Sequence, residues 1–406
     1  MLHINEYRSI VGNQVIDELY ILAEKLKGFS ITNVNSTAMG GGVAEILNRM
    51  IPLMRNLGLS VFWEVIKGDD VFFDITKKIH NGLHGVEVSI TRQEFKHFLE
   101  INQKNSEDFK NWADIMYIHD PQPIGLVKKR KQFKNKWIWR CHIDFSKPQR
   151  DIWLFLKKFI EKYDASVFSA PAFSRRLSIP QVLVAPSIDP LSDKNKELEQ
   201  GFIDSVLSRF GIDKDKPIIT QVSRFDYLKD PVGVIKAYRL VKKYTDCQLV
   251  LAGGGAKDDP EGQKVLKEVM DEAEADKDIF VLLLPSDSNL EINALQRASS
   301  VILQKSLKEG FGLTVCEGLW KEKPVIAGAV GGIPLQIAHK YSGILTYTVE
   351  GTAYWIKHLL HEPEYAKILG QHGKQHVKNN FLITRHIQDY LLLFLSLFNR
   401  DDEVNL

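Results

Sequence analysis

Short apolar runs alternate with amphipathic stretches along the first half of the chain. The run ITNVN at 31–35 is rich in β-branched residues, and after it Val43, Leu47 and Met50 recur at helical spacing. A strand followed by a helix is the repeating unit of parallel sheets that carry helices on both faces. Further apolar runs follow at VFWEVI (61–66), DIMYI (114–118), WIW (137–139), SVF (166–168) and VLVA (182–185). The pattern predicts one doubly wound sheet in this half.

The alternation restarts after a polar, proline-containing stretch at 185–198. An amphipathic stretch from Val232 to Tyr244 follows Asp230, a good N-cap, and Pro231, which has no N–H to lose. The strands predicted in this half are PIITQV, QLVLAG, IFVLLL, SVILQ and KPVIAG. A second Rossmann-like domain is therefore expected.

The length of 406 residues also favours two domains, because one hydrophobic core rarely serves so long a chain. We expect an N-terminal domain at 1–186 and a C-terminal domain at 187–384, with a helix at about 385–400 packing back on the first. Two α/β sheets joined by a linker are expected to face each other across a cleft that binds ligands.

Composition and charge narrow the class of protein. The hydrophobic fraction of 44% is ordinary for a soluble chain, and 53 Lys and Arg against 51 Asp and Glu argue against a nucleic-acid binder. The N-terminus lacks the pattern of a secretory signal, and the run LLLFLSLF is too short to cross a bilayer. Cys141, Cys247 and Cys316 lack zinc-ligand spacing and suit a reducing compartment. We expect a cytoplasmic protein.

A glycine-rich turn lies between the first predicted strand and the helix after it. In Met39-Gly40-Gly41-Gly42 the absence of side chains would let backbone amides approach an anion or a sugar, with Gly41 and Gly42 nearest the helix start. The alternative is a tight connection without a ligand. The turn has neither a Walker A lysine nor a complete G-x-G-x-x-G, so it does not indicate a P-loop or a standard dinucleotide site.

Two cations follow the strand PIITQV in the segment VSRFDYLKDP. Arg224 and Lys229 would lie on a loop at the carboxyl end of that strand, where two positive charges can embrace a diphosphate. The alternative is a solvated basic loop.

The segment KEGFGLTVCEGLW carries two carboxylates around a helix start. Glu309 and Glu317 flank a glycine-rich turn, and the amides of Phe311, Gly312, Leu313 and Thr314 could bind phosphate oxygens because the first helical N–H groups lack internal partners. Glu317 could then accept hydrogen bonds from ribose hydroxyls. By spacing alone, the two glutamates could also be a solvated helix face.

These residues resemble the donor site of the retaining GT-B glycosyltransferases that form sucrose and trehalose. AVGGIPLQI (329–337) strengthens the resemblance, and four N-terminal segments narrow it to the trehalose glycosyltransferring synthases, with trehalose phosphorylases more distant. Those segments are VNSTAMGGGVAEIL, HDPQP (119–123), WRCHIDFSKP and PSIDPLSDKN. The resemblance departs at AHKYSGILT (338–346), which lacks the first glycine of the family's usual D-G-x-x-G-F-L-V segment, and at LAGGGAKDDPEG, which has more glycine than expected.

The resemblance implies roles for residues in both halves. It places Glu309 beside the donor glucose hydroxyls and His142 near the reacting centre and the donor's 6-hydroxyl. Arg224, Lys229 and the helix-start amides would stabilise the departing diphosphate without a metal, and no strand-terminal Asp-x-Asp favours metal-dependent transfer. Same-face substitution would then retain the α configuration.

Acceptor recognition is assigned to polar residues that follow two strands of the first half. Asp120 and Gln122 come directly after DIMYI and His119, and Asn35 and Ser36 follow the first strand. The alternative is that they satisfy local backbone groups, and His119 could be structural.

The predicted reaction is transfer of glucose from a nucleoside-diphosphate glucose to glucose, forming α,α-trehalose. The partners are small molecules, no cofactor or metal is expected, and the oligomeric state is open, with a homodimer as one option. Alternatives are trehalose phosphorylase, a membrane-bound enzyme with a lipid acceptor, suggested by KKRKQFKNKWIW (128–139), and a non-catalytic sugar-nucleotide sensor.

Overall fold

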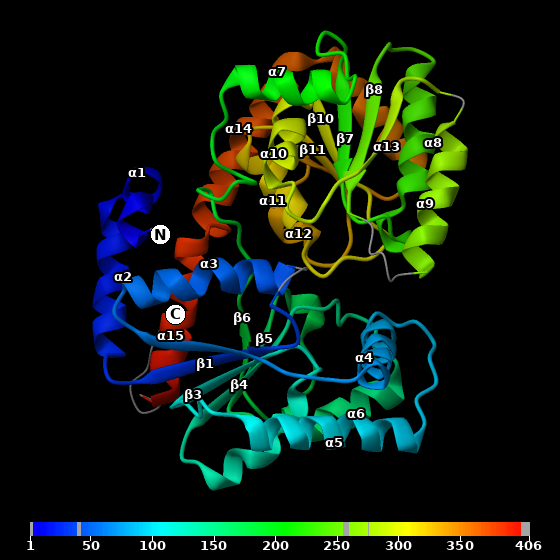
Figure 1. Cartoon of the computed structure of the whole chain (residues 1–406). Coiled ribbons are helices and arrows are strands. Elements are labelled where there is room, and N and C mark those ends of the chain that lie inside the picture. Colours follow the sequence, from blue (N-terminus) through cyan, green and yellow to red (C-terminus); the bar gives the residue numbers. More distant parts are fainter. Residues whose placement is uncertain (1–2, 39–41, 255–259, 275, 399–406) are drawn as a thin grey trace. The chain divides into compact units, whose positions relative to one another are not determined.

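The computed structural model divides into two compact units (Figure 1). It describes residues 3–38, 42–254, 260–274 and 276–398. The N-terminal unit comprises the residues up to Ser187 together with those from Ile383 onward, and the C-terminal unit spans Ile188 to Leu382.

The N-terminal unit is built on a six-stranded sheet in which every pairing is parallel. In spatial order its strands are β2 (Ser60–Val65), β1 (Ser30–Asn35), β3 (Ile115–His119), β4 (Lys136–Cys141), β5 (Ala165–Phe168) and β6 (Gln181–Leu183). The helices are α1 (Arg8–Val11), α2 (Asn13–Lys25), α3 (Gly42–Asn56), α4 (Asp70–Leu83), α5 (Arg92–Asp108), α6 (Arg150–Ile160) and α15 (Ile383–Phe398), with short 3-10 turns η1 (Ile4–Tyr7), η2 (Ile124–Gln132) and η3 (Pro171–Phe173). The strands predicted in this half are confirmed.

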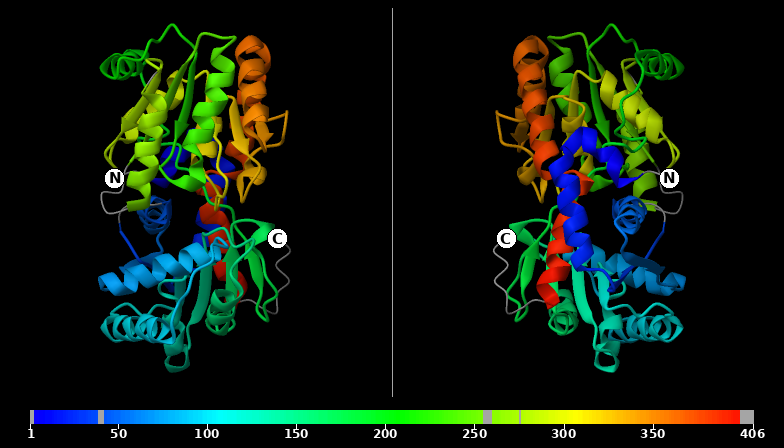
Figure 2. Two further views of the ribbon diagram at one scale, coloured as in Figure 1. Left: turned by 90° about the vertical axis from the view of Figure 1, so that its right-hand side faces the viewer. Right: turned by 90° about the vertical axis from the view of Figure 1, so that its left-hand side faces the viewer.

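Helix α15 packs within the N-terminal unit, beside α2 (Figure 2). Leu391, Leu393 and Phe394 are at most 3% exposed, and the ring of Tyr390 lies 4.8 Å from that of Tyr117 on β3, centroid to centroid. The apolar C-terminal run is therefore part of a core. No described helix combines the length and the apolar composition needed to cross a bilayer.

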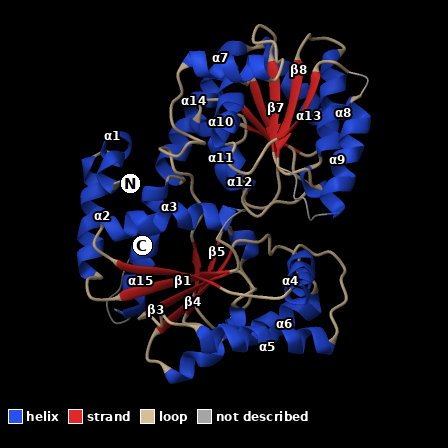
Figure 3. Ribbon diagram, in the orientation of Figure 1, coloured by secondary structure: helices blue, strands red, loops and turns tan. Residues whose placement is uncertain are grey.

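The C-terminal unit repeats the architecture with a second parallel sheet (Figure 3). In spatial order its strands are β12 (Ile344–Thr346), β11 (Val325–Gly328), β10 (Val301–Gln304), β7 (Ile218–Val222), β8 (Gln248–Gly253) and β9 (Ile279–Leu283). The helices are α7 (Gln200–Arg209), α8 (Pro231–Lys242), α9 (Pro260–Ala273), α10 (Asn289–Ala298), α11 (Leu313–Trp320), α12 (Ile333–Gln336), α13 (Val349–His361) and α14 (Pro363–Asn380), with one 3-10 turn, η4 (Tyr227–Lys229). Five of the strands are those predicted, while β12 lies in the segment AHKYSGILT and was not predicted.

The start of α8 shows how local chemistry sets an element boundary. Asp230 takes a left-handed conformation, φ 48° and ψ 50°, and its side chain accepts a hydrogen bond from the Gly233 N–H at 3.1 Å. Pro231 then occupies the first helical position, where it loses no hydrogen bond. The predicted cap is confirmed.

The strand order places a switch point in each sheet. In the N-terminal unit the chain moves from β1 outward to β2 and returns to β3 on the other side of β1, and in the C-terminal unit β7 and β10 are neighbours in the same way. Ligands in open α/β sheets bind beyond the carboxyl ends of strands at such points. The predicted acceptor and donor residues follow these strands.

Candidate active site

In the N-terminal unit, polar side chains gather at the carboxyl ends of β1, β3 and β4. His119 Nδ1 lies 3.1 Å from His142 Nε2, and His119 Nε2 lies 3.1 Å from Asn33 Oδ1. Burial, and then the positive charge of Arg140, lower the pKa of His119 to about 3, and the same two causes lower the pKa of His142 well below its usual range. Both rings are therefore neutral at pH 7. The residue His142 is partly exposed.

Asp120 sits where β3 ends, in a backbone conformation that few residues adopt. Its φ is 64°, and its Oδ1 accepts a hydrogen bond from the His142 N–H at 2.7 Å, while its carbonyl accepts one from Trp139 Nε1 at 2.9 Å. Left-handed conformations of residues other than glycine cluster at functional sites. Burial raises the pKa of Asp120 to about 7, although the His142 N–H and Arg140 lower it. Its carboxyl can therefore exchange a proton near neutral pH.

The remaining predicted acceptor residues differ in how their side chains are used. Asn35 is satisfied within the unit, because its Nδ2 donates to the Thr37 carbonyl at 2.6 Å and its Oδ1 accepts from Trp63 Nε1 at 2.9 Å. Ser36, directly after β1, is partly exposed. Gln122 Oε1 is buried without a hydrogen-bond partner among the described residues. The Gln122 side chain therefore has an unused acceptor.

The glycine-rich turn is described only in part. Gly41 lies outside the described residues, and Gly42 is the first residue of α3. Its predicted contact with the donor stays a prediction.

In the C-terminal unit, the loop after β7 meets the loop after β10. Lys229 Nζ donates to Glu309 Oε2 at 2.5 Å, and Ser306 Oγ and Gln304 Nε2 donate to the same oxygen at 3.1 and 3.3 Å. A backbone bond from the Leu307 N–H to the Leu228 carbonyl, 2.8 Å, fastens the two loops together. Residues 80 positions apart in the sequence are therefore neighbours.

Arg224, one of the predicted donor residues, has an exposed side chain. Its side chain is 65% exposed, and its Nη2 lies 3.2 Å from Asp226 Oδ2. The end of β8 approaches this loop so closely that a Cβ on Gly253 would lie 1.7 Å from the Ser223 carbonyl oxygen. This contact explains one glycine of the segment LAGGG: a side chain there would displace the loop that carries Arg224.

Helix α11 begins at Leu313, and its N-cap residue, Gly312, has no side chain to cap it. Gly312 has φ 82°, a conformation that favours glycine, and Leu313 and Thr314 at the helix start are partly exposed. Phe311 is buried against the ring of Phe381, 5.6 Å between centroids. The first amides of a helix attract anions, so this end suits a phosphate.

The stretch AVGGIP packs directly under Glu309. A Cβ on Gly331 would lie 1.6 Å from the Glu309 carbonyl oxygen, and the Gly332 N–H donates to the Gly310 carbonyl at 3.1 Å. Glycine at 331 is therefore required for the backbone that presents Glu309.

Glu317 is buried in α11, only 4% exposed. Its Oε2 accepts a hydrogen bond from Gln296 Nε2 at 3.1 Å, and Lys194 Nζ lies 4.0 Å from its Oε1. The interpretation of a solvated helix face is thus wrong for Glu317. Sequence reasoning missed Gln296 and Lys194, which come from α10 and from the stretch before α7 and share no motif with Glu317.

Two other features bear on the alternatives. Trp137 and Trp139 of the basic segment 128–139 are fully buried in the core of the N-terminal unit, so they do not form an aromatic membrane surface.

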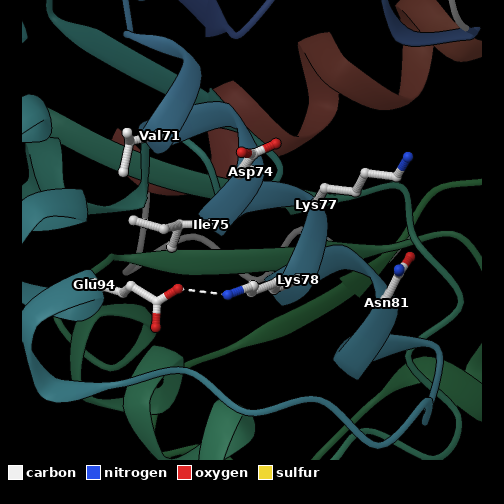
Figure 4. Close-up of a pocket in the computed structure, with 7 residues that line it drawn as sticks. All are labelled: Val71, Asp74, Ile75, Lys77, Lys78, Asn81 and Glu94. Carbon is white, nitrogen blue, oxygen red and sulfur yellow. Dashed lines mark hydrogen bonds and ion pairs between the residues drawn. The ribbon is translucent and has the colours of Figure 1, made fainter. Parts of the chain in front are cut away.

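A pocket between α4 and the start of α5 is crossed by the ion pair of Lys78 and Glu94, 2.5 Å, and contains none of the predicted site residues (Figure 4). Within the described ranges no group of three His, Cys, Asp or Glu side chains could hold a metal ion.

Comparison with known proteins identifies the family. Residues 33–175 match the family model described as trehalose synthase, N-terminal domain, and residues 204–376 match glycosyl transferases group 1. The trehalose synthase of Thermococcus litoralis is 45% identical over 399 residues, which cover 97% of each chain. The chain belongs to the trehalose synthase family. The resemblance found in the sequence is confirmed.

The trehalose synthase family places the chain among glycosyltransferases with the GT-B fold. The crystal structure of α,α-trehalose 6-phosphate synthase from Burkholderia multivorans matches 92% of this chain and 100% of its own, with a TM-score of 0.74 at 16% identity. The predicted fold class is confirmed. A trehalose phosphorylase of Pleurotus pulmonarius is more distant, 29% identical, with 84% of this chain matching 54% of its length.

Proposed function

We propose that the chain transfers glucose from a nucleoside-diphosphate glucose to free glucose, forming α,α-trehalose with retention and without a metal ion. The observation that carries this proposal is the meeting of Lys229 with Glu309 at the switch point of the C-terminal sheet. A cation for the diphosphate and a carboxylate for sugar hydroxyls lie side by side there, next in sequence to the start of α11.

In the proposed reaction the bond between the sugar's anomeric carbon and the phosphate oxygen breaks, and negative charge develops on the leaving diphosphate. Lys229, Arg224 and the first amides of α11 stabilise that charge. A hydroxyl of the acceptor glucose attacks from the same face, and its proton passes to the departing phosphate oxygen. The configuration of the donor is retained because bond breaking and bond forming use one face.

In this proposal Glu309 orients the donor sugar, since its Oε2 is already held by three donors from the protein. Glu317 accepts hydrogen bonds from the ribose, with Gln296 and Lys194 fixing its carboxylate. In the N-terminal unit, Asp120 and Gln122 bind the acceptor glucose, and His142 bonds a sugar hydroxyl.

The test is an incubation of the EDTA-treated protein with UDP-, ADP- or GDP-glucose and glucose. Free nucleotide is measured, and the disaccharide is identified by NMR. Formation of α,α-trehalose without added metal is the expected result and ranks the donors. A β-linked product would refute retention, restoration of activity only by Mg²⁺ would refute metal independence, and no transfer from any donor would refute the donor class. A covalent glycosyl-enzyme, detected by mass spectrometry, would refute same-face substitution.

A further inference from the structure

Three side chains from adjacent strands of the N-terminal sheet form a continuous hydrogen-bonded chain. Asn33 comes from β1, His119 from the end of β3, and His142 follows β4 directly, so parallel pairing of these strands sets them in a row. The two contacts are both 3.1 Å, and the imidazole rings lie 5.4 Å apart, centroid to centroid, at 22° to each other. Nδ1 of His119 therefore faces Nε2 of His142, and Nε2 of His119 faces the side-chain oxygen of Asn33.

The chemistry of the amide at one end sets the protonation along the row. Asn33 Oδ1 is a carbonyl oxygen and only accepts, so His119 Nε2 must carry the hydrogen. A neutral imidazole has one N–H, which leaves His119 Nδ1 as an acceptor. His142 Nε2, 3.1 Å away, must then donate, and the lone pair of His142 is on Nδ1.

The surroundings keep both rings neutral, which this assignment requires. Arg140, fully buried on β4, opposes a second positive charge at both histidines, and His386 on α15 acts on His142 in the same direction. Asp120 contacts His142 through the backbone N–H, and the ring of Tyr117 lies 4.7 Å from that of His119. Among the described residues, the imidazole nitrogens hydrogen-bond to Asn33 and to each other, and not to a carboxylate.

We propose that Asn33 and His119 are positioning residues that hold His142 in its Nε2–H form, so that Nδ1 accepts a hydrogen bond from a sugar hydroxyl. This inference rests on the proposed function, in which His142 contacts the sugar. In this proposal the Asn33 amide fixes the position of the hydrogen on His119. His119 in turn fixes the position of the hydrogen on His142, the ring that contacts the substrate. His142 is then a hydrogen-bond acceptor at neutral pH and holds no proton to give through Nδ1.

The first test reads the protonation directly and does not depend on turnover. In protein labelled with ¹⁵N-histidine, long-range ¹H–¹⁵N correlations distinguish the two neutral forms of each ring, and the signals are assigned with His119→Gln and His142→Gln. We expect both rings to be neutral and protonated at Nε2 at pH 7. An Nδ1–H form or a charged ring at either position would overturn the proposal, whatever the enzyme's donor proves to be.

The second test uses a matched pair at position 119. Glutamine can donate to Asn33 and accept from His142 as the neutral imidazole does, whereas leucine can do neither. We expect His119→Gln to keep kcat within about threefold and His119→Leu to lower kcat about 10- to 100-fold, because a buried N–H of His142 loses its partner. Equal losses in both variants would show that His119 only fills space.

A third variant changes the charge of the row without changing its shape. Asn33→Asp places a carboxylate beside His119, which favours the imidazolium. A charged His119 donates from Nδ1 and forces His142 to carry its hydrogen on Nδ1, so activity should fall about 10-fold at low pH and recover as pH rises. The control is Thr32→Val on the same strand, which removes the bond from Thr32 Oγ1 to the Asn111 carbonyl and should leave the pH profile unchanged. An unchanged pH profile of activity in Asn33→Asp would count against the proposal that Asn33 and His119 set the protonation of His142.

Discussion

The two units share one architecture, a six-stranded parallel sheet with a switch point, but place different chemistry at those points. In the C-terminal unit, formal charges face each other: Lys229 and Glu309 lie 2.5 Å apart, and Arg224 is largely exposed. In the N-terminal unit, His119 and His142 are kept neutral by burial and by Arg140. Formal charge suits a diphosphate, whose developing charge must be stabilised, whereas neutral donors and acceptors suit an uncharged sugar.

The two halves of the chain also match different family models. The N-terminal half matches a model described for trehalose synthase, while the C-terminal half matches the broad group 1 of glycosyl transferases. We infer that the charged site carries what many such enzymes share and that Asp120 and Gln122 of the N-terminal unit carry the choice of acceptor. Substitutions at each site would separate these two roles.

The largest effect is expected from Lys229→Ala. If Lys229 stabilises the leaving diphosphate as a preorganised donor does, its loss costs about 2–4 kcal/mol in the transition state, a decrease in kcat of roughly 30- to 1000-fold. The KM for glucose should change little, because the acceptor is assigned to the other unit. Steady-state kinetics with saturating donor measure both. The control is Lys236→Ala on the exposed face of α8, and a loss below threefold in Lys229→Ala would refute the assignment.

A smaller effect is expected from pH on the stability of the N-terminal unit. The pKa of His119 is lowered to about 3, and the pKa values of His142 and His386 lie well below their usual range, so below pH 6.5 the unfolded chain binds protons that the folded chain does not. Asp120, with its pKa raised to about 7, acts in the opposite direction between about pH 4 and 7. The unfolded chain gains protons at three histidines, and the folded chain gains one at Asp120. The free energy of unfolding should therefore decrease as pH falls.

The measurement is urea unfolding between pH 5 and 6.5, followed by tryptophan fluorescence. His119→Gln should reduce the slope of unfolding free energy against pH by an amount that approaches about 1.4 kcal/mol per pH unit towards pH 5, the limit for one proton. Thr32→Val should lower stability without altering the slope. A slope in His119→Gln equal to that of the parent would show that His119 is charged in the folded protein.

The sequence predicted the regular elements better than the contacts between them. Eleven strands followed from apolar runs, and Asp230 with Pro231 marked the start of α8, because those signals lie within a few residues. Strand β12 escaped detection because its apolar run is only two residues long, Ile344 and Leu345. Strand order then explains why predicted residues far apart in the chain meet at two switch points.

The partners of the site residues could not be predicted in the same way. Asn33 and His119 are 86 positions apart, and Gln296 and Glu317 are 21 apart. No local pattern links them, since each contact depends on how strands and helices pack. The sequence also predicted Asn35 as an acceptor ligand, yet its amide is bonded to Thr37 and Trp63, which the order of residues does not reveal.

The smallest effect is expected from Glu317→Gln, which keeps the side chain's size and removes its charge. The substitution should weaken UDP and ADP binding about 5- to 10-fold, roughly 1 kcal/mol, because a ribose hydroxyl then bonds to a neutral acceptor. Gln296 can still donate to the new amide oxygen, so the fold should persist. Calorimetry with each nucleotide measures the change, and Glu364→Gln on the exposed side of α14 is the control. If nucleotide affinity is unchanged while glucose affinity falls, Glu317 serves the acceptor, and the division of labour between the two units is wrong.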